Sequence, residues 1–149
     1  MPLGAWHMAT QRRLHALFSD NNLYFWDFHY GEQRKLDAGL KNIKHFPDFL
    51  VRFKDKNLNN SYIAIELKSI SRLMDNRNAI QLRYFVKRFD GFILLTEQPQ
   101  YEPLSVWMTL EGLNHKIRWI YERNILSEVA NYAKNDNSFR WFYDRYADK

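Results

Sequence analysis

The chain has 149 residues, of which 46% are hydrophobic and 17% aromatic, so it can fold as one domain around a sizeable core. It contains no cysteine, which excludes disulfides, cysteine-ligated zinc and thiol catalysis, and which suits a reducing cytoplasm. The 22 Lys and Arg residues outnumber the 17 Asp and Glu residues, a surplus that is compatible with a polyanionic partner but does not require one.

The start of the chain predicts no secretory signal, because residues 1–8 lack a long apolar core. No apolar run approaches the roughly 20 residues that are needed to span a bilayer. We therefore expect a cytoplasmic protein with no membrane partner, associated with the nucleoid or, if the protein is viral, located in the host cytoplasm. The pair His7-Met8 is compatible with a cloning junction, so the expectations drawn from the sequence in this subsection do not use residues 1–7.

The first half of the chain predicts one helix and three strands. Residues 8–19 follow a helical period with apolar side chains on one face. The aromatic-rich residues 22–30 are typical of a strand, whereas residues 31–45 are polar and predict a loop, with or without one helical turn. Residues 46–53 and 62–69 are two further predicted strands. The loop between them is rich in Asn, Asp and Lys, so the two strands are expected to form a hairpin.

The second half predicts helices around one more strand. Residues 70–89 follow a helical period, and residues 92–96 are a short apolar run that is typical of a buried parallel strand. A strand, a helix and a strand in this order predict a βαβ unit. Two more helices are predicted at residues 112–123 and about 126–146. The buried face of the helix over 70–89 is expected to consist of Ile70, Leu73, Met74, Ile80, Tyr84 and Phe85.

These elements together predict an α/β fold with a central mixed β-sheet flanked by helices. Neither an internal repeat nor a flexible linker divides the sequence. We therefore expect residues 1–149 to form a single domain, with a core over about residues 8–97 and a helical C-terminal part over about residues 104–149.

Two short acidic motifs lie on the predicted hairpin. Asp48 follows Pro47 at the head of one strand, and Glu66 and Lys68 lie two residues apart on the next. Because side chains alternate along a strand, Glu66 and Lys68 face the same side as Ala64, while the apolar residues between them point into a core. The hairpin brings Asp48 to the same end, so we expect two carboxylates and one lysine to converge.

This trio suits phosphodiester hydrolysis. Two carboxylates provide the hard oxygen ligands that Mg²⁺ prefers, and the bound ion polarises a phosphate and acidifies a water molecule. A neighbouring lysine offsets the negative charge that develops on the phosphate. The alternative is structural, because Glu-x-Lys is common on the solvated face of an edge strand and Pro-Asp commonly starts a turn. We favour the catalytic interpretation because both motifs occur in order on adjacent strands.

Over about residues 8–97 the chain resembles the PD-(D/E)xK nuclease superfamily, whose motif is matched by Pro47-Asp48 and by Glu66-Leu67-Lys68. Within that superfamily it is most similar to the TnsA-type transposon endonucleases, which cleave DNA at the ends of mobile elements. The similar segments are HFPDFLVRF, YIAIELKS, GFILLTEQP and LNHKIRWIYERN. Phage junction resolvases share the first two. The resemblance implies a nuclease domain with a restriction-endonuclease-like core.

The resemblance also implies roles for individual residues. Asp48 and Glu66 would be metal ligands, together with the main-chain carbonyl of Leu67, and Lys68 would be the catalytic lysine. The expected ion is Mg²⁺, with Mn²⁺ as a substitute. The family usually has an acidic residue in its first helix, and that place falls here at Gln11, which argues against a two-metal scheme. Gln11 would either hold a metal-bound water or be an exposed helix residue.

The helix over residues 70–89 carries further candidates. Gln81 is expected either to face the active site as a catalytic residue, as a polar residue does in some relatives, or to face the solvent. A basic band on the same helix would contact DNA phosphates without reading sequence, or would be a solvated helix face. No two histidines have a spacing typical of zinc sites, and His45, the one near the motif, is expected to have a structural role. The basic band consists of Arg77, Arg83, Lys87 and Arg88.

We therefore expect a Mg²⁺-dependent endodeoxyribonuclease that acts on double-stranded DNA at mobile-element ends, beside a transposase or another recombination protein. Whether it forms a homodimer is left open. The first alternative is an autonomous phage nuclease, or a repair or junction-resolving nuclease, of the same fold. The second alternative is a catalytically inactive DNA-binding module, which the amide at Gln11 favours and the intact Asp48, Glu66 and Lys68 disfavour.

Overall fold

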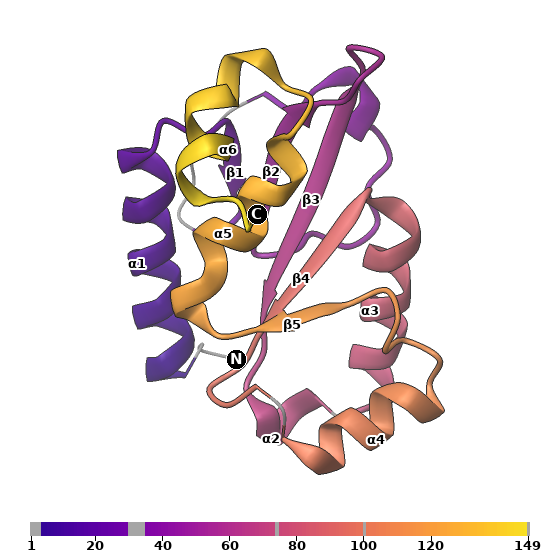
Figure 1. Cartoon of the computed structure of the whole chain (residues 1–149). Helices are drawn as coiled ribbons and strands as arrows, with labels where there is room; N and C mark the ends of the chain where they lie inside the picture. Colours follow the sequence, from indigo (N-terminus) through magenta and orange to yellow (C-terminus); the bar gives the residue numbers. More distant parts are fainter. Residues whose placement is uncertain (1–3, 30–34, 74, 100, 149) are drawn as a thin grey trace.

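The computed structural model describes residues 4–29, 35–73, 75–99 and 101–148. Over these residues the chain is an α/β protein with a five-stranded mixed sheet and six α-helices (Figure 1). No helix in the described ranges is both long enough and apolar enough to cross a membrane.

The sheet has its strands in chain order, β1-β2-β3-β4-β5. The first three strands are antiparallel neighbours, and β4 and β5 then add in parallel to β3. The predicted hairpin and the predicted βαβ unit are both confirmed by this pairing. The strands are β1 (Phe25–Asp27), β2 (Phe49–Lys54), β3 (Asn60–Leu67), β4 (Gly91–Leu95) and β5 (Arg118–Ile120).

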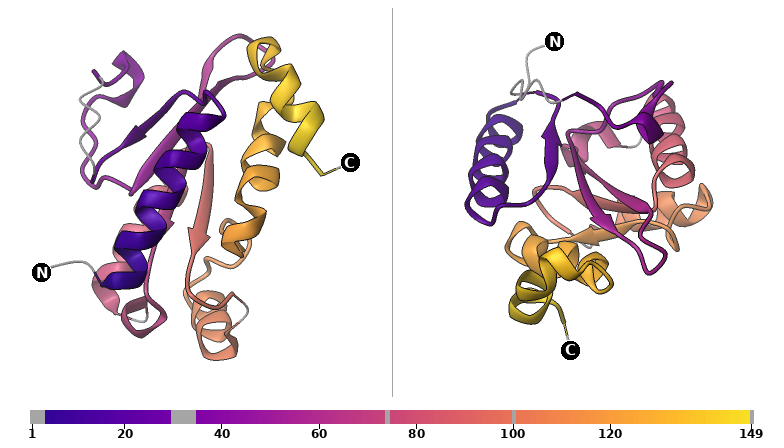
Figure 2. Two further views of the ribbon diagram at one scale, coloured as in Figure 1. Left: turned by 90° about the vertical axis from the view of Figure 1, so that its left-hand side faces the viewer. Right: turned by 90° about the horizontal axis from the view of Figure 1, so that it is seen from above.

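Helices cover both faces of the sheet. One face packs against α1, α5 and α6, and the other packs against α3 and α4, which gives three layers (Figure 2). The predicted helix over residues 8–19 is confirmed and begins slightly earlier. The helices are α1 (Ala5–Asp20), α2 (Ile70–Leu73), α3 (Asn76–Arg88), α4 (Glu102–Leu110), α5 (Ile125–Ala130) and α6 (Arg140–Tyr146).

The strand β3 lies in the middle of the sheet and is buried on both faces. Ile63, Ile65 and Leu67 belong to the core under α1, α5 and α6, as alternation predicts. On the opposite face, Ala64 belongs to a second apolar core with Leu82 of α3. The interpretation of Glu-x-Lys as the solvated face of an edge strand is therefore wrong, because β2 and β4 flank this strand.

The predicted helix over residues 70–89 is divided into α2 and α3. Asp75 precedes α3 and its side chain accepts a hydrogen bond from the backbone N–H of Arg77 at 2.8 Å, which caps the new helix. This break changes the phase of the helical pattern. Ile80, expected to be buried, is 56% exposed, and Phe85 is buried as expected. The buried residues of α3 are Ala79, Leu82 and Phe85; the side chain of Leu73 and all of Met74 lie outside the described residues.

The predicted helix over residues 112–123 is wrong. After α4, Gly112 adopts a left-handed conformation with φ of +70°, which is available to glycine at little cost and which ends the helix. Residues 118–120 then form β5, where Trp119 lies opposite Leu94 of β4. The indole N–H of Trp119 donates to the Thr96 hydroxyl at 2.9 Å, which fixes this edge of the sheet.

The predicted single helix over residues 126–146 is also wrong. Between α5 and α6, the carboxylate of Asp136 accepts hydrogen bonds from the backbone N–H of Lys54 at 2.7 Å and of Ser138 at 3.0 Å. Asp136 therefore connects this part of the chain to the end of β2 by a hydrogen bond and begins a new turn. Because of this turn, residues 126–146 do not form one straight helix.

Candidate active site

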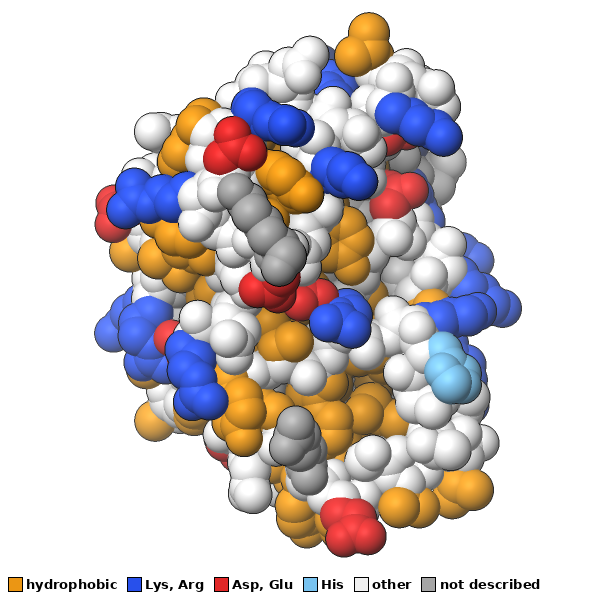
Figure 3. All heavy atoms as spheres, in the orientation of Figure 1, with side chains coloured by type: hydrophobic (Ala, Val, Ile, Leu, Met, Phe, Trp, Pro, Cys, Tyr) orange, Lys and Arg blue, Asp and Glu red, His pale blue; other side chains and the backbone are white. Residues whose placement is uncertain are grey.

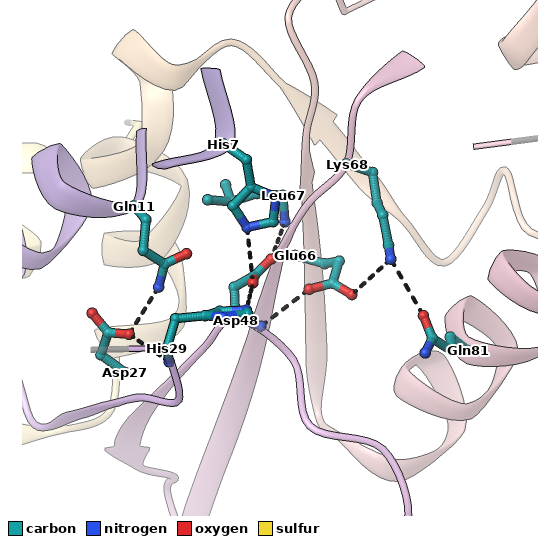
Figure 4. Close-up of polar contacts among 9 residues, drawn as sticks. All are labelled: His7, Gln11, Asp27, His29, Asp48, Glu66, Leu67, Lys68 and Gln81. Atoms are coloured by element: carbon teal, nitrogen blue, oxygen red, sulfur yellow. Dashed lines mark hydrogen bonds and ion pairs between the residues drawn. The ribbon is translucent and has the colours of Figure 1, made fainter. Parts of the chain in front are cut away.

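Asp48 and Glu66 lie side by side at the end of the β2-β3 hairpin. The register pairs Phe49 with Ile65, so the next position outward places Asp48 opposite Glu66. The backbone N–H of Asp48 donates to Glu66 Oε1 at 3.1 Å, and the backbone N–H of Leu67 donates to Asp48 Oδ2 at 2.7 Å (Figure 4). Both carboxylates are buried, with exposures of 2% and 5%. The predicted convergence of the two acids is confirmed.

Burial and hydrogen bonding drive the pKa values of the two carboxyl groups apart. Burial raises the pKa of Glu66 well above its ordinary value, and the negative charge of Asp48 adds to this effect. Burial also opposes the ionisation of Asp48, but hydrogen bonds with His29, His7 and Glu66 outweigh it and hold the pKa of Asp48 well below its usual range. Asp48 is therefore the more acidic member of the pair, and a divalent cation beside the two groups would favour the ionised form of both.

Lys68 reaches the acidic pair from the end of β3. Its Nζ lies 3.7 Å from Glu66 Oε2 and donates to Gln81 Oε1 at 3.3 Å (Figure 4). The Lys68 side chain is 22% exposed, so one side of the ammonium group remains open to solvent. Of the two orientations expected for Gln81, the structure therefore shows the one in which its side chain contacts Lys68.

A cavity of about 700 Å³ opens beside the Lys68 ammonium group. It lies where β3 passes into α2 and α3, and Gln81 forms part of its wall. Arg72 and Arg77 also line it, and Arg77 is 91% exposed and lies 3.8 Å from Asp75, the one acidic residue among the described residues of the lining. Arg72 is not among the residues predicted from the sequence. The lining of the cavity thus carries an excess of positive charge.

The predicted basic band on α3 is not one surface. Arg77 lines the cavity, whereas Arg83 forms an ion pair with Glu111 at the end of α4. Arg88 lies at the other end of α3 from Arg77 and donates to the carbonyl of Gly39 at 2.8 Å. Lys87 is exposed. On the face shown in Figure 3, Lys and Arg side chains lie in separate groups with acidic and hydrophobic side chains between them.

Two histidines that the sequence did not single out contact Asp48. His7 Nε2, from the first turns of α1, lies 3.1 Å from Asp48 Oδ1. His29, just after β1, contacts the same oxygen, and this hydrogen bond to Asp48 raises the pKa of His29. His45 is not the histidine at the site, because its ring packs against Tyr84 with 5.1 Å between centroids. The sequence contains one indication of this arrangement, because His7 and Gln11 are one helical turn apart and therefore lie on the same face of a helix.

Gln11 lies fully buried beneath the site, so the expectation of an exposed helix residue is wrong. Its Nε2 donates to Asp27 Oδ1 at 2.8 Å, and the backbone N–H of His29 donates to that oxygen at 3.0 Å. The other oxygen of Asp27 lies 2.8 Å from His15 Nδ1. Asp27 is a third buried acid, at 1% exposure, that the sequence did not single out.

The chain was compared with protein-family models, with curated proteins and with solved structures, and no match was found in any of the three. What the site can do therefore follows from its own residues.

Proposed function

We propose that the chain is a metal-dependent DNA endonuclease of the PD-(D/E)xK type with a restriction-endonuclease-like core. The observation that carries this proposal is the buried pair of Asp48 and Glu66 with the ammonium group of Lys68 beside it. Buried carboxylates are rare unless they are paired or bind a cation. Here the two acids are neighbours, and the ammonium group of Lys68 lies 3.7 Å from Glu66 Oε2.

The residues fit a hard divalent cation. Asp48 and Glu66 would hold Mg²⁺, or Mn²⁺ in its place, and the main-chain carbonyl of Leu67 would be a further ligand. Mg²⁺ bound there would polarise the scissile phosphate and lower the pKa of a water molecule. The opposed pKa values of the pair support this assignment, since a cation would favour the ionised form of both acids.

Lys68 and its neighbours would bind the phosphate. The Lys68 ammonium group donates to Gln81 and lies 3.7 Å from Glu66 Oε2, and these contacts would restrict its position before substrate arrives. Its open side faces the cavity, where it would pair with a phosphate oxygen and offset the charge that builds up during attack. Arg72 and Arg77 on the cavity wall would contact neighbouring phosphates of the same strand.

The substrate proposed is double-stranded DNA at the end of a mobile element, with a transposase or another recombination protein as partner. Support for this finer assignment comes from the TnsA-like segments. Two of them form adjacent parallel strands, because GFILLTEQP contains β4 and LNHKIRWIYERN contains β5. The remaining two form the hairpin that carries Asp48, Glu66 and Lys68.

The proposal is tested by nicking of supercoiled plasmid with Mg²⁺, Mn²⁺ or Ca²⁺. We expect cleavage with Mg²⁺ and Mn²⁺ and little with Ca²⁺, which is larger, binds with looser geometry and acidifies water less. Lys68→Ala should abolish cleavage, whereas His115→Ala should not change it, because His115 is exposed and does not line the cavity beside Lys68. Circular dichroism of each variant controls for folding. Absence of metal-dependent cleavage by the wild type would refute the nuclease, and retained DNA binding would then favour the inactive module.

A further inference from the structure

Three segments that are distant in the sequence bring nitrogen and oxygen ligands to one point. His7 comes from α1, His29 follows β1, and Asp48 precedes β2 (Figure 4). One ring nitrogen of each histidine and one carboxylate oxygen all lie within 4.8 Å of one another. Both imidazoles approach Oδ1 of Asp48, whereas Oδ2 accepts the backbone N–H of Leu67. The histidines thus occupy one side of the carboxylate.

Within this group, the distance between the His7 and Asp48 atoms is close to that of two ligands around a small ion, whereas His29 Nε2 lies closer to Asp48 Oδ1 and would move away from it to bind one. His7 Nε2 lies 3.1 Å from Asp48 Oδ1. Two ligands at the usual Zn–N and Zn–O distances, arranged tetrahedrally, are separated by about 3.3 Å. A tetrahedral ion would therefore need only small movements of the His7 and Asp48 side chains to fit.

An unpaired buried oxygen lies next to the same group. Gln11 is fully buried, and its Oε1 has no hydrogen-bond partner among the described residues. Its Nε2 donates to Asp27, so Oε1 points away from Asp27 and towards the side of His7 (Figure 4). His7 and Gln11 are also one helical turn apart, on the same face of α1. A buried carbonyl oxygen without a donor is costly, and a metal ion or a metal-bound water would satisfy it.

We propose that His7, His29 and Asp48 form a transition-metal site, with Zn²⁺ as its preferred ion and Gln11 Oε1 as an additional ligand or a hydrogen-bond acceptor for a bound water. Two imidazoles and one carboxylate suit Zn²⁺ and similar ions, whereas Mg²⁺ prefers oxygen ligands alone. The site shares Asp48 with the proposed nuclease centre, and its histidines approach the carboxylate at Oδ1. Binding at this site therefore does not depend on whether the chain cleaves DNA.

The alternative is that both histidines only hydrogen-bond a buried carboxylate. The two cases differ in what a single histidine substitution does to metal affinity. The His29 side chain is 39% exposed, so His29→Ala should leave a folded protein. His115→Ala is the matched control, because this histidine is exposed and stands outside the group.

The experiment is calorimetric titration of the full chain with Zn²⁺ and, separately, with Mg²⁺, supported by visible absorption spectra with Co²⁺ as a substitute. We expect one Zn²⁺ per chain in wild type and in His115→Ala. His29→Ala and His7→Ala should weaken Zn²⁺ binding by at least about tenfold, a common size for the loss of a metal-site group. Mg²⁺ binding should be the same in wild type and His29→Ala.

Two outcomes would overturn the inference. The first is that wild type binds no Zn²⁺, and the second is that His29→Ala and wild type bind it equally. Neither outcome bears on Mg²⁺-dependent plasmid cleavage, which tests the nuclease proposal separately. Conversely, a protein that binds Zn²⁺ through both histidines but never cleaves DNA would retain this site and lose the proposed function.

Discussion

Replacing each buried acid by its amide separates the charged member of the pair from the neutral one. Asp48, with its lowered pKa, is ionised and accepts hydrogen bonds from Leu67 N–H, His7 and His29. Glu66, with its raised pKa, retains its proton to higher pH than Asp48 and accepts the Asp48 N–H at Oε1. Gln reproduces the shape and the hydrogen bonding of a protonated Glu, whereas Asn removes a charge that its neighbours need.

The magnitudes follow from the hydrogen bonds. A hydrogen bond to a charged group contributes about 1.5–3 kcal/mol, so Asp48→Asn should cost about 3 kcal/mol of the free energy of unfolding. Glu66→Gln should cost less than about 1 kcal/mol, since its hydrogen bond to the Asp48 N–H survives. At about 2–4 °C per kcal/mol for a chain of this size, the Tm should fall by about 6–12 °C in the first variant and by at most about 4 °C in the second.

The assay is thermal unfolding at about pH 5 with chelator present, together with plasmid cleavage at neutral pH. Glu66→Gln should remain almost as stable as wild type and yet lose Mg²⁺-dependent cleavage, because a neutral amide binds Mg²⁺ poorly. Equal losses of Tm in the two amide variants would show that Glu66 is ionised and that the charge assignment is wrong. Normal cleavage by Glu66→Gln would remove Glu66 from the metal ligands.

The other predictions concern pH, salt and α1. Because burial raises the pKa of Glu66 above 4.5, the folded protein keeps a proton that the unfolded chain loses as pH rises, and wild type loses stability over this pH range. The free energy of unfolding of Glu66→Gln, measured by urea denaturation, should therefore rise relative to that of wild type from pH 5 towards the folded pKa. The expected rise is up to about 1.4 kcal/mol per pH unit. No such gain would contradict the raised pKa. Replacing Arg72 and Arg77 together by Ala should flatten the salt dependence of duplex DNA binding by a log–log slope of about 0.9 for each phosphate that the variant no longer neutralises, and an unchanged slope would place the DNA elsewhere. Gln11→Glu sets a carboxylate against Asp27 and should lower the Tm in chelator, with recovery on adding divalent metal; an unchanged Tm would refute this repulsion.

The parts of the site that the sequence predicts are those built by local geometry. Alternation along one strand sets the direction of Glu66, and the register of a short hairpin sets Asp48 opposite it. Each of these inferences needs only neighbouring elements, so the sequence identifies the acidic pair and the lysine together. For Gln81 the sequence leaves two orientations open, and the structure shows the one in which its side chain contacts Lys68.

The parts that the sequence does not predict depend on packing between distant elements. His7 and Asp48 are 41 residues apart, and only the position of α1 on the sheet brings them together. The same holds for the cations of α3, where α4 supplies the partner of Arg83 and the loop at Gly39 supplies that of Arg88. Helical periodicity indicates which side of a helix is apolar, but it does not indicate which element that side will contact.

The amide at position 11 has a structural reason that the sequence alone does not reveal. The family resemblance predicts an acid there, and Gln11 therefore suggests a weakened active site. In the structure the amide faces Asp27, a carboxylate that is almost fully buried, and donates to it at 2.8 Å. A glutamate in this place would set two buried negative charges against each other, which costs more than an amide hydrogen bond returns. Because Gln11 Nε2 donates to Asp27, only the neutral oxygen Oε1 is left to face an ion, and in the proposed metal site the two imidazoles on Asp48 would supply the further ligands.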